Sequence, residues 1–496
     1  MSKRGMGLWI LAGLLLMWLG MGTWQRFKPL PEGVGVAFPE RPAERVRFLA
    51  DRTWYDAAGR RHLDQAIFDE ALALIGGARR LVVADMFLFN DFAGSATGQD
   101  FRALSRQLTQ ALIDQKRDHP GLEAVVITDP LNTLYGGLVP DHFARLRQAG
   151  VRVVETDLTR LRASNPLWSG LWHLVPRWFG NRADGGWLPN LLGPGRVTLR
   201  SYLALLNFQA NHRKTLVVDQ DDGWAGLVTS ANPHDASSLH GNVALRFQGA
   251  AALDLLASER AVASWSGVAL PEPALPGPAL PGPASPDTGP SSSSVSSSTK
   301  GARVQLVTEG AVRDALLAAI AASDAGDRLD VAMFYLAHRG VIEALKQARG
   351  RGVRVRVLLD PNRDAFGIEK GGIPNRPVAL ELHREAVEVR WCVTQGEQCH
   401  TKLLLRRPAD GGEAEMILGS ANVTRRNLDD LNLETSVRLV GPADTPAIRE
   451  AGTFFDGRWK SSPEHVTSEP FDAFDEATPW QRLRYRVMEA TGLSTF

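Results

Sequence analysis

An internal duplication constrains the fold of this chain more than any other feature. Two apolar segments contain the pair Met-Phe, at Met86 and at Met333. Each is followed by a helical pattern and then by an apolar segment that ends in Asp-Pro, at Asp129 and Asp360. Short apolar segments alternating with helical patterns are typical of α/β units. The duplication therefore predicts two similar α/β lobes packed face to face in one chain.

Each copy then carries a His-x-Lys pair in an apolar segment. The pairs are His212 with Lys214 and His400 with Lys402. Residues two apart in a strand project from the same face, so each histidine and its lysine point to one side of the sheet. A single His-x-Lys arises readily by chance, and its ordinary interpretation is a pair of surface residues. Two pairs at matching places in a repeat indicate a functional site instead.

A Ser-x-Asn pair follows each histidine by eighteen to twenty residues. The pairs are Ser230 with Asn232 and Ser420 with Asn422. Attack on a phosphodiester needs a nucleophile, an acid for the leaving oxygen and positive or amide groups around phosphorus. One imidazole can be the nucleophile and the other the acid. We expect both lysines and these serine and asparagine side chains to bind the substrate phosphate.

These doubled motifs resemble those of the phospholipase D superfamily, over most of residues 46–465. The resemblance implies an α/β fold of two similar lobes, each part of a central mixed sheet flanked by helices. It implies one active site at the lobe interface, a phosphohistidine intermediate, and neither a metal ion nor another cofactor. Both motifs lie in one chain, so we expect a monomer.

The second copy departs from the family pattern. His212 is followed after Lys214 by Asp219, whereas the corresponding position after His400 is Arg407. This position has an odd offset from the histidine, so in a strand it faces away from the motif side chains. We therefore expect Asp219 to stabilise the fold. Its replacement by Arg407 in the second copy should affect the structural framework more than the catalytic chemistry.

A second asymmetry concerns the group that orients each imidazole. Aligning the two copies places Glu434 opposite Asn242. In family members with this asymmetry, such as the tyrosyl-DNA phosphodiesterases, the second lobe's glutamate pairs with the first lobe's histidine. The resemblance thus implies that Glu434 orients His212 and that Asn242 approaches His400. A carboxylate stabilises an imidazolium better than an amide does, which favours His212 as nucleophile and His400 as acid.

The N-terminal segment predicts a membrane anchor. Residues 5–24 carry no charge and as a helix would span about 30 Å, one bilayer core. A cleaved signal peptide is the alternative, but its apolar core is shorter and a small-x-small cleavage site follows it. We expect residues 1–28 to anchor the protein in a bacterial inner membrane. A short basic N-terminus usually stays in the cytoplasm, which favours a periplasmic body. The positive charges on the two sides of the segment are nearly equal, however, with Lys3 and Arg4 before it and Arg26 and Lys28 after it.

The rest of the chain divides around a low-complexity segment. Residues 271–290 contain eight prolines, and seven serines follow within 291–298, so we expect an exposed linker over 269–300. The lobes then span 46–268 and 301–465, with a tail over 466–496. Cys392 and Cys399 precede His400; they either form a disulfide that braces this loop or remain free thiols.

The first lobe carries an insertion. Asp129 and His212 are 83 residues apart, whereas Asp360 and His400 are 40 apart, so the first lobe has 43 more residues here. The insertion, about 160–195, contains four tryptophans, and Trp168, Leu171, Trp172 and Val175 have helical spacing. The segment either packs on the core or lies at a membrane interface, where tryptophan is favoured.

The charge balance weighs against a protein that mainly grips nucleic acid. Lys and Arg total 56 and Asp and Glu total 55, a formal net charge of +1. The resemblance, the anchor and the tryptophan-rich insertion together imply a membrane-anchored phosphodiesterase that hydrolyses phospholipids or transfers phosphatidyl groups, as a cardiolipin synthase-like enzyme does. One alternative is a metal-independent nuclease of the same superfamily, which would need a basic groove to bind nucleic acid. The other is a non-catalytic membrane scaffold, which the intact histidines disfavour.

Overall fold

The computed structural model describes residues 3–92, 100–190, 192–221, 223–272, 298–365, 368–369, 371–474, 476–492 and 494. Most of the predicted linker lies outside these ranges. Our prediction that its proline- and serine-rich part is exposed therefore concerns residues outside the described ranges.

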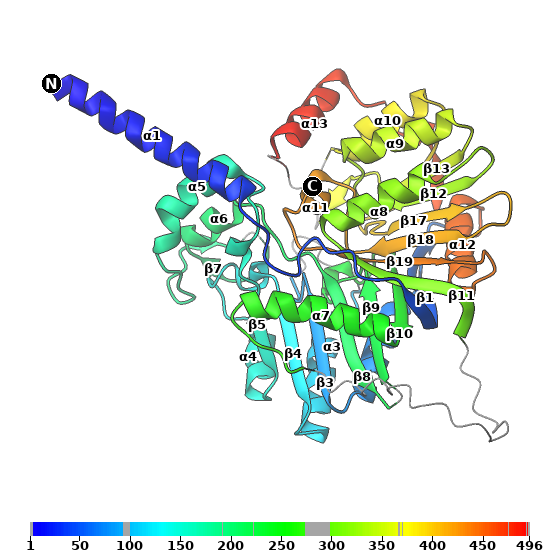
Figure 1. The fold of residues 1–496 in the computed structure, drawn as a ribbon, viewed down its shortest axis with the longest axis horizontal. Helices are drawn as coiled ribbons and strands as arrows, with labels where there is room; N and C mark the ends of the chain where they lie inside the picture. Colours follow the sequence, from blue (N-terminus) through cyan, green and yellow to red (C-terminus); the bar gives the residue numbers. More distant parts are fainter. Residues whose placement is uncertain are drawn as a thin grey trace, which may run out of the picture.

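Both lobes contribute to one 16-stranded mixed sheet (Figure 1). Its strand order is β20-β16-β13-β12-β17-β18-β19-β11-β1-β10-β9-β8-β3-β4-β5, with β2 paired to β1. The first lobe supplies β1 (Arg41–Tyr55), β2 (Arg61–Asp64), β3 (Leu81–Met86), β4 (Glu123–Thr128), β5 (Arg152–Glu155), β8 (Lys214–Gln220), β9 (Gly223–Thr229) and β10 (Asn242–Gln248). The second supplies β11 (Ser298–Thr308), β12 (Arg328–Met333), β13 (Arg354–Leu359), β16 (Glu388–Cys392), β17 (Lys402–Arg407), β18 (Ala414–Gly419), β19 (Thr435–Gly441) and β20 (Ser468–Pro470).

Equivalent strands pair in the same way in the two lobes. In each lobe, two neighbouring strands are parallel, as β3 is to β4 and β12 is to β13. The His-x-Lys strand then runs antiparallel to the first of them, β8 beside β3 and β17 beside β12. Antiparallel pairing of β1 with β11 joins the two halves edge to edge. The predicted α/β fold with a central mixed sheet and flanking helices is confirmed.

Helices cover both faces of the sheet. The first lobe has α2 (Ile67–Gly77), α3 (Leu104–Asp118), α4 (Asp141–Gln148) and α7 (Ala250–Trp265). The second has α8 (Gly310–Ala321), α9 (Arg339–Gly350), α10 (Asn375–Arg384), α11 (Arg425–Leu428), α12 (Pro446–Trp459) and α13 (Pro479–Thr491). Short elements complete the chain: β6 (Leu188–Pro189), β7 (Arg196–Val197), β14 (Asp364–Ala365), β15 (Ile368–Glu369), and the 3₁₀ turns η1 (Pro130–Thr133), η2 (Leu158–Arg160), η3 (Pro176–Trp178), η4 (Asp235–Ser237) and η5 (Phe471–Ala473).

The central hydrophobic core is shared by the two lobes. It contains Leu245 of β10 and Leu255 of α7 together with Met416 of β18 and Phe455 of α12. Alternate side chains of each strand face opposite layers, so Ala244 belongs instead to the outer core of the first lobe, with α2, α3 and α4. A third core holds α8, α9 and α10 against the other face of the second lobe. The shared core explains why the two lobes are packed against each other.

Helix α1 (Lys3–Phe27) is the one helix in the described ranges that is long and apolar enough to cross a membrane. It projects away from the body, and its C-terminal end meets the insertion (Figure 1). There, Gly22 of α1 crosses Gly170 of α5 (Pro166–Leu174), and the Trp18 indole N–H donates to the Leu167 carbonyl oxygen at 2.7 Å. The two glycines permit this close backbone approach.

The insertion of about 160–195 folds as α5, η3 and β6, and is followed by β7 and α6 (Leu199–Leu205). Its tryptophans do not share one exposed face. Trp172 is buried beneath the guanidinium of Arg200, which lies 3.9 Å from the ring centroid. Val175 follows the end of α5. A single interfacial face is therefore the wrong interpretation for Trp172, because tertiary packing overrides the helical spacing. Trp178 and Trp187 are 72% and 59% exposed.

Candidate active site

Backbone pairing between the lobes brings the two His-x-Lys segments to one interface. The amide of His212 donates to the Leu433 carbonyl oxygen at 2.9 Å. In the related place of the second motif, the Gly241 amide donates to the Gln398 carbonyl oxygen at 3.0 Å. Each histidine therefore lies beside the start of a strand of the opposite lobe. Glu434 and Asn242 are located at these strand starts.

The predicted crossed partners meet the histidines. A Glu434 carboxylate oxygen lies 2.9 Å from Nδ1 of His212, and the Asn242 side-chain oxygen lies 3.1 Å from Nδ1 of His400. An acceptor at Nδ1 favours the tautomer that carries its proton there, which leaves Nε2 of each ring able to accept a proton or attack phosphorus. One ring thus has a carboxylate behind it and the other an amide.

The two serines form hydrogen bonds with the partners of the histidines. Ser420 donates to the Glu434 carboxylate, and Ser230 donates to the Asn242 oxygen at 3.0 Å. Asn427 also donates to Glu434. We had expected Ser230 and Ser420 to bind substrate, but their hydroxyls hold the residues that orient the histidines.

The two asparagines differ in their surroundings. The Asn232 side-chain oxygen accepts the Leu88 amide at 3.3 Å, so it is tied to the first lobe. The Asn422 side-chain oxygen is buried and has no hydrogen-bond partner among the described residues. A buried polar atom without a partner is costly, and a ligand donor that pairs with it relieves that cost.

Both lysines lie buried beside their histidines. The Lys214 ammonium donates to the His212 carbonyl oxygen at 2.6 Å, and the Lys402 ammonium donates to the His400 carbonyl oxygen at 3.0 Å. Burial lowers the pKa of Lys214 to about 7, although Glu434 opposes this. Burial and the nearby Lys214 charge hold the pKa of Lys402 well below its usual value. Two buried cations that repel each other make this a site for an anion.

Burial lowers the pKa values of both histidines. Burial, which Glu434 offsets only in part, lowers the pKa of His212 to about 4. Burial and then Lys402 lower the pKa of His400 well below its usual value. His212 and Lys214 hold the pKa of Glu434 below its usual range against the effect of burial, so this carboxylate is charged. A neutral imidazole with a charged carboxylate behind it is suited to nucleophilic attack.

Three further residues support the site and were not among our expected site residues. Asp129 accepts the Asn211 amide and Asp360 accepts the Cys399 amide, each at 2.7 Å, one residue before the histidine. The repeated Asp-Pro was the signal in the sequence. His240 lies with its ring centroid 5.9 Å from that of His400, and its Nδ1 accepts the Gln398 amide. No motif marks His240, because only the lobe interface brings it there.

Asp219 and Arg407 both point away from the histidines, and both serve the framework. Asp219 accepts the backbone amides of residues 79–81. In the second lobe, Arg407 instead forms ion pairs with Asp330 and Asp456. The second copy therefore replaces backbone hydrogen bonds by an ion-pair cluster at the same place. Cys392 and Cys399 form a disulfide that closes the loop before His400.

Comparisons with known proteins bear on the fold and on the second lobe. Residues 316–459 match the family model described as "Cardiolipin synthase, PLD-like domain". The phosphatidylserine synthase of Haemophilus influenzae has the same fold, with a TM-score of 0.55 at 11% identity, over 92% of this chain and 96% of that one. The second lobe thus matches a phospholipase D-like domain, and the fold of the whole chain is similar to that of this phosphatidylserine synthase.

Two other solved structures match this chain with TM-scores below 0.5. A polyphosphate kinase from Porphyromonas gingivalis matches with a TM-score of 0.45 at 12% identity, over 90% of this chain. The present chain spans about half, 53%, of that kinase's length. Nuc from Salmonella typhimurium, a phospholipase D family member, matches with a TM-score of 0.26 at 18% identity, over 34% of this chain and 97% of that one. A search of curated proteins finds no match.

Proposed function

We propose that this protein is a membrane-anchored phosphodiesterase of the phospholipase D type that hydrolyses phospholipids or transfers their phosphatidyl group to an alcohol. The observation that carries the proposal is the crossed arrangement of His212 with Glu434 and His400 with Asn242, next to two buried lysines. Two imidazoles with unequal partners suit a two-step displacement at phosphorus, and the lysines supply the positive charge for it.

In the first step, Nε2 of His212 attacks phosphorus and forms a P–N bond while the bond to the leaving oxygen breaks. The Glu434 carboxylate stabilises the positive charge that develops on the ring. His400 gives its proton to the leaving oxygen, which departs as an alcohol. The incoming phosphodiester anion offsets the lysine charges that depress the His400 pKa, so substrate binding itself favours the protonated acid.

In the second step, His400 is neutral and accepts a proton from water or from an alcohol. The resulting oxygen nucleophile forms a P–O bond, the P–N bond to His212 breaks, and His400 is protonated again. Water gives hydrolysis and an alcohol gives transfer. Transfer to the headgroup of a second lipid would be the cardiolipin synthase-like version, which the description of the matching family model favours.

A phospholipid is the substrate class that the rest of the molecule suits. Helix α1 has the length and apolar composition of a membrane span. Its end packs against α5 of the insertion, and the chain continues from the insertion towards His212. Ser169 of the insertion donates to Asn207 at 2.8 Å, close to the catalytic segment. An anchor docked in this way holds the lobe interface beside a bilayer and raises the local concentration of lipid.

The test is an assay of the full chain in lipid nanodiscs on labelled phosphatidylglycerol, phosphatidylethanolamine and single-stranded DNA. We expect release or transfer of phosphatidyl groups. Label from the lipid phosphate should be trapped on the wild type and on a His400→Ala variant, but not on His212→Ala. Turnover of DNA without turnover of lipid would overturn the substrate assignment, and label on His400 would reverse the two roles.

A further inference from the structure

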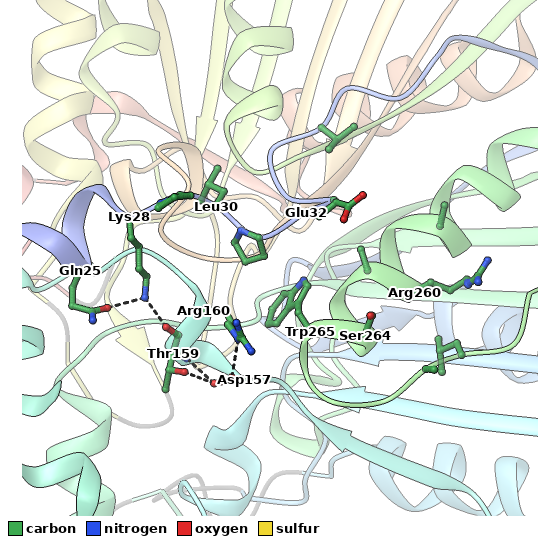
Figure 2. A pocket seen from close by; sticks show the side chains of 18 of the residues that line it. Gln25, Lys28, Leu30, Glu32, Asp157, Thr159, Arg160, Arg260, Ser264 and Trp265 are labelled. Carbon is green, nitrogen blue, oxygen red and sulfur yellow. Dashed lines mark hydrogen bonds and ion pairs between the residues drawn. The ribbon is translucent and has the colours of Figure 1, made fainter.

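A large cleft lies at the foot of α1, apart from the four side chains of the His-x-Lys motifs. Its volume is about 1170 Å³. The walls are the end of α1, the segment that follows it, η2, the insertion and α7 (Figure 2). Since α1 ends at Phe27, a bilayer that holds α1 would place the opening of this cleft at the level of the lipid headgroups.

Cations outnumber carboxylates in the cleft. Its lining includes four basic side chains and two acidic ones, which are Lys28, Arg160, Arg177, Arg260, Glu32 and Asp157. The only ion pair between these six within the described residues joins Arg160 to Asp157 at 3.4 Å. Arg260 also pairs with Glu272, at 3.4 Å, so Lys28 and Arg177 are the cations of this lining that have no ion pair among the described residues.

Lys28 is the clearest case. Its side chain is buried, and Figure 2 shows it directed toward Thr159. The ammonium donates to the Gln25 side-chain oxygen at 2.7 Å and to the Thr159 carbonyl oxygen at 2.5 Å, and no carboxylate of the described residues lies within 4.0 Å. Burial lowers the pKa of Lys28 to about 8; the charge of Asp157 opposes this shift, and Arg177 adds to it. A buried cation with only neutral partners is stabilised strongly by an anion.

Arg177 is placed to act with Lys28. One of its N–H groups donates to Nδ1 of His173 at 2.8 Å, and its guanidinium lies 4.7 Å from the Trp178 ring centroid. Burial, Arg177 and Lys28 lower the pKa of His173 to about 4, so this histidine is a neutral acceptor. Both cations thus have neutral partners within the described chain and have donors to spare for a phosphate group.

The remaining walls are apolar. Trp24 and Leu30 line the side nearest α1, and Trp265 and Leu270 line the opposite side. The indole N–H of Trp265 is buried and has no hydrogen-bond partner among the described residues. A basic end together with aromatic and aliphatic walls matches a molecule that has an anionic head and a hydrocarbon body.

We propose that this cleft binds the phosphate headgroup of an anionic membrane phospholipid that is not the molecule undergoing reaction. The inference rests on the proposed membrane anchoring by α1, because the bilayer is the source of the lipid. Lys28 and Arg177 contact the phosphate, and the apolar walls contact the glycerol and the first carbons of the chains. The bound lipid would hold α1, the insertion and α7 together.

The test uses the full chain in detergent, in a His212→Ala background that prevents turnover by the proposed mechanism. Native mass spectrometry counts bound dihexanoyl phosphatidylglycerol, with dihexanoyl phosphatidylcholine and inorganic phosphate as the comparison ligands. Lys28→Gln combined with Arg177→Gln should lose one bound phosphatidylglycerol, with a rise in Kd of about tenfold or more, as expected when charge-assisted hydrogen bonds are removed. Lys28→Arg alone should retain it.

Arg449→Gln, an exposed charge on α12, is the matched control and should bind as the parent does. Unchanged phosphatidylglycerol binding by the double variant would overturn the proposal. Equally tight binding of phosphatidylcholine or inorganic phosphate at this site would overturn its lipid-headgroup assignment. Binding is measured without turnover, so a failure of the proposed enzymatic activity would be seen separately, in the nanodisc assay.

Discussion

The Glu434 carboxylate of the second lobe lies 2.9 Å from Nδ1 of His212 in the first lobe. The corresponding contact of His400 is with the amide oxygen of Asn242, at 3.1 Å. A duplicated fold with two His-x-Lys motifs thus has an asymmetric pair of imidazoles. The difference between a carboxylate and an amide is what assigns the nucleophile and the acid in the proposed mechanism.

Glu434→Gln should slow formation of the phosphohistidine about 10- to 100-fold, because an amide stabilises an imidazolium less well than a carboxylate. Substrate affinity should change less, since Glu434 stands behind the ring rather than against the substrate. Rapid-quench measurement of label on His212 gives the rate. Asn242→Ala is the comparison and should affect this first step less; a larger effect of Asn242→Ala would contradict the assignment.

Lys402→Met should abolish activity and yet stabilise the protein, by about 1–2 kcal/mol at pH 7. The substitution removes a buried amine whose charged form is disfavoured by burial and by Lys214, and keeps an unbranched side chain of similar length. Thermal unfolding and turnover, measured on the same samples, give the two effects. Lys460→Met changes an exposed lysine and should alter neither; a fall in the unfolding temperature of Lys402→Met would show that the charge stabilises the fold.

The pH dependence of stability should carry two contributions of opposite sign. Burial lowers the pKa of His234 to about 4, so the unfolded chain binds a proton there that the folded chain does not. Relative to His234→Gln, the wild type should therefore lose up to about 1.4 kcal/mol per pH unit as the pH falls from about 6.5 to 4.

Burial has the reverse effect on Asp51, whose pKa it raises to about 6. Relative to Asp51→Asn, the wild type should lose stability as the pH rises from about 4 to 6. Denaturant unfolding at a series of pH values measures both differences. Two slopes of the same sign would contradict the assigned directions.

Gly170→Ala should separate α1 from the insertion. A Cβ at this position would lie 2.8 Å from the Trp18 carbonyl oxygen and 2.9 Å from the Gly22 nitrogen, both in the backbone of α1. Hydrogen exchange of the α5 amides should accelerate, while turnover of a small soluble phosphodiester should be unchanged. Gly20→Ala is the matched control, since a Cβ there meets nothing within 4 Å. Equal exchange in the two variants would mean that the crossing does not hold α5 in place.

Trp178→Ser combined with Trp187→Ser should weaken binding to vesicles when α1 is removed, because these two side chains are exposed. Trp172→Ser should instead destabilise the fold by about 3 kcal/mol or more, since it empties a buried site. Vesicle sedimentation and thermal unfolding distinguish these effects. Since α1 is absent, vesicle binding that survives the double substitution would assign the remaining membrane contact to surface residues other than these two tryptophans.

The sequence by itself determined the features that depend on local period and repetition. The doubled His-x-Lys pairs, the alternation of strands and helices, and the odd offset that turns Asp219 and Arg407 away from the histidines all follow from residue spacing. Strand parity is a property of the backbone alone, so it needs no knowledge of what a strand packs against.

Only the tertiary structure decided which groups meet. Glu434 is 222 residues from His212, and their contact exists because the two lobes share one core and one sheet. Packing within each lobe placed the Ser230 and Ser420 hydroxyls on Asn242 and Glu434, buried Trp172 under Arg200, and formed the cleft at Lys28. Contacts between distant segments depend on how surfaces pack after the strands have formed, and residue spacing carries no record of that packing.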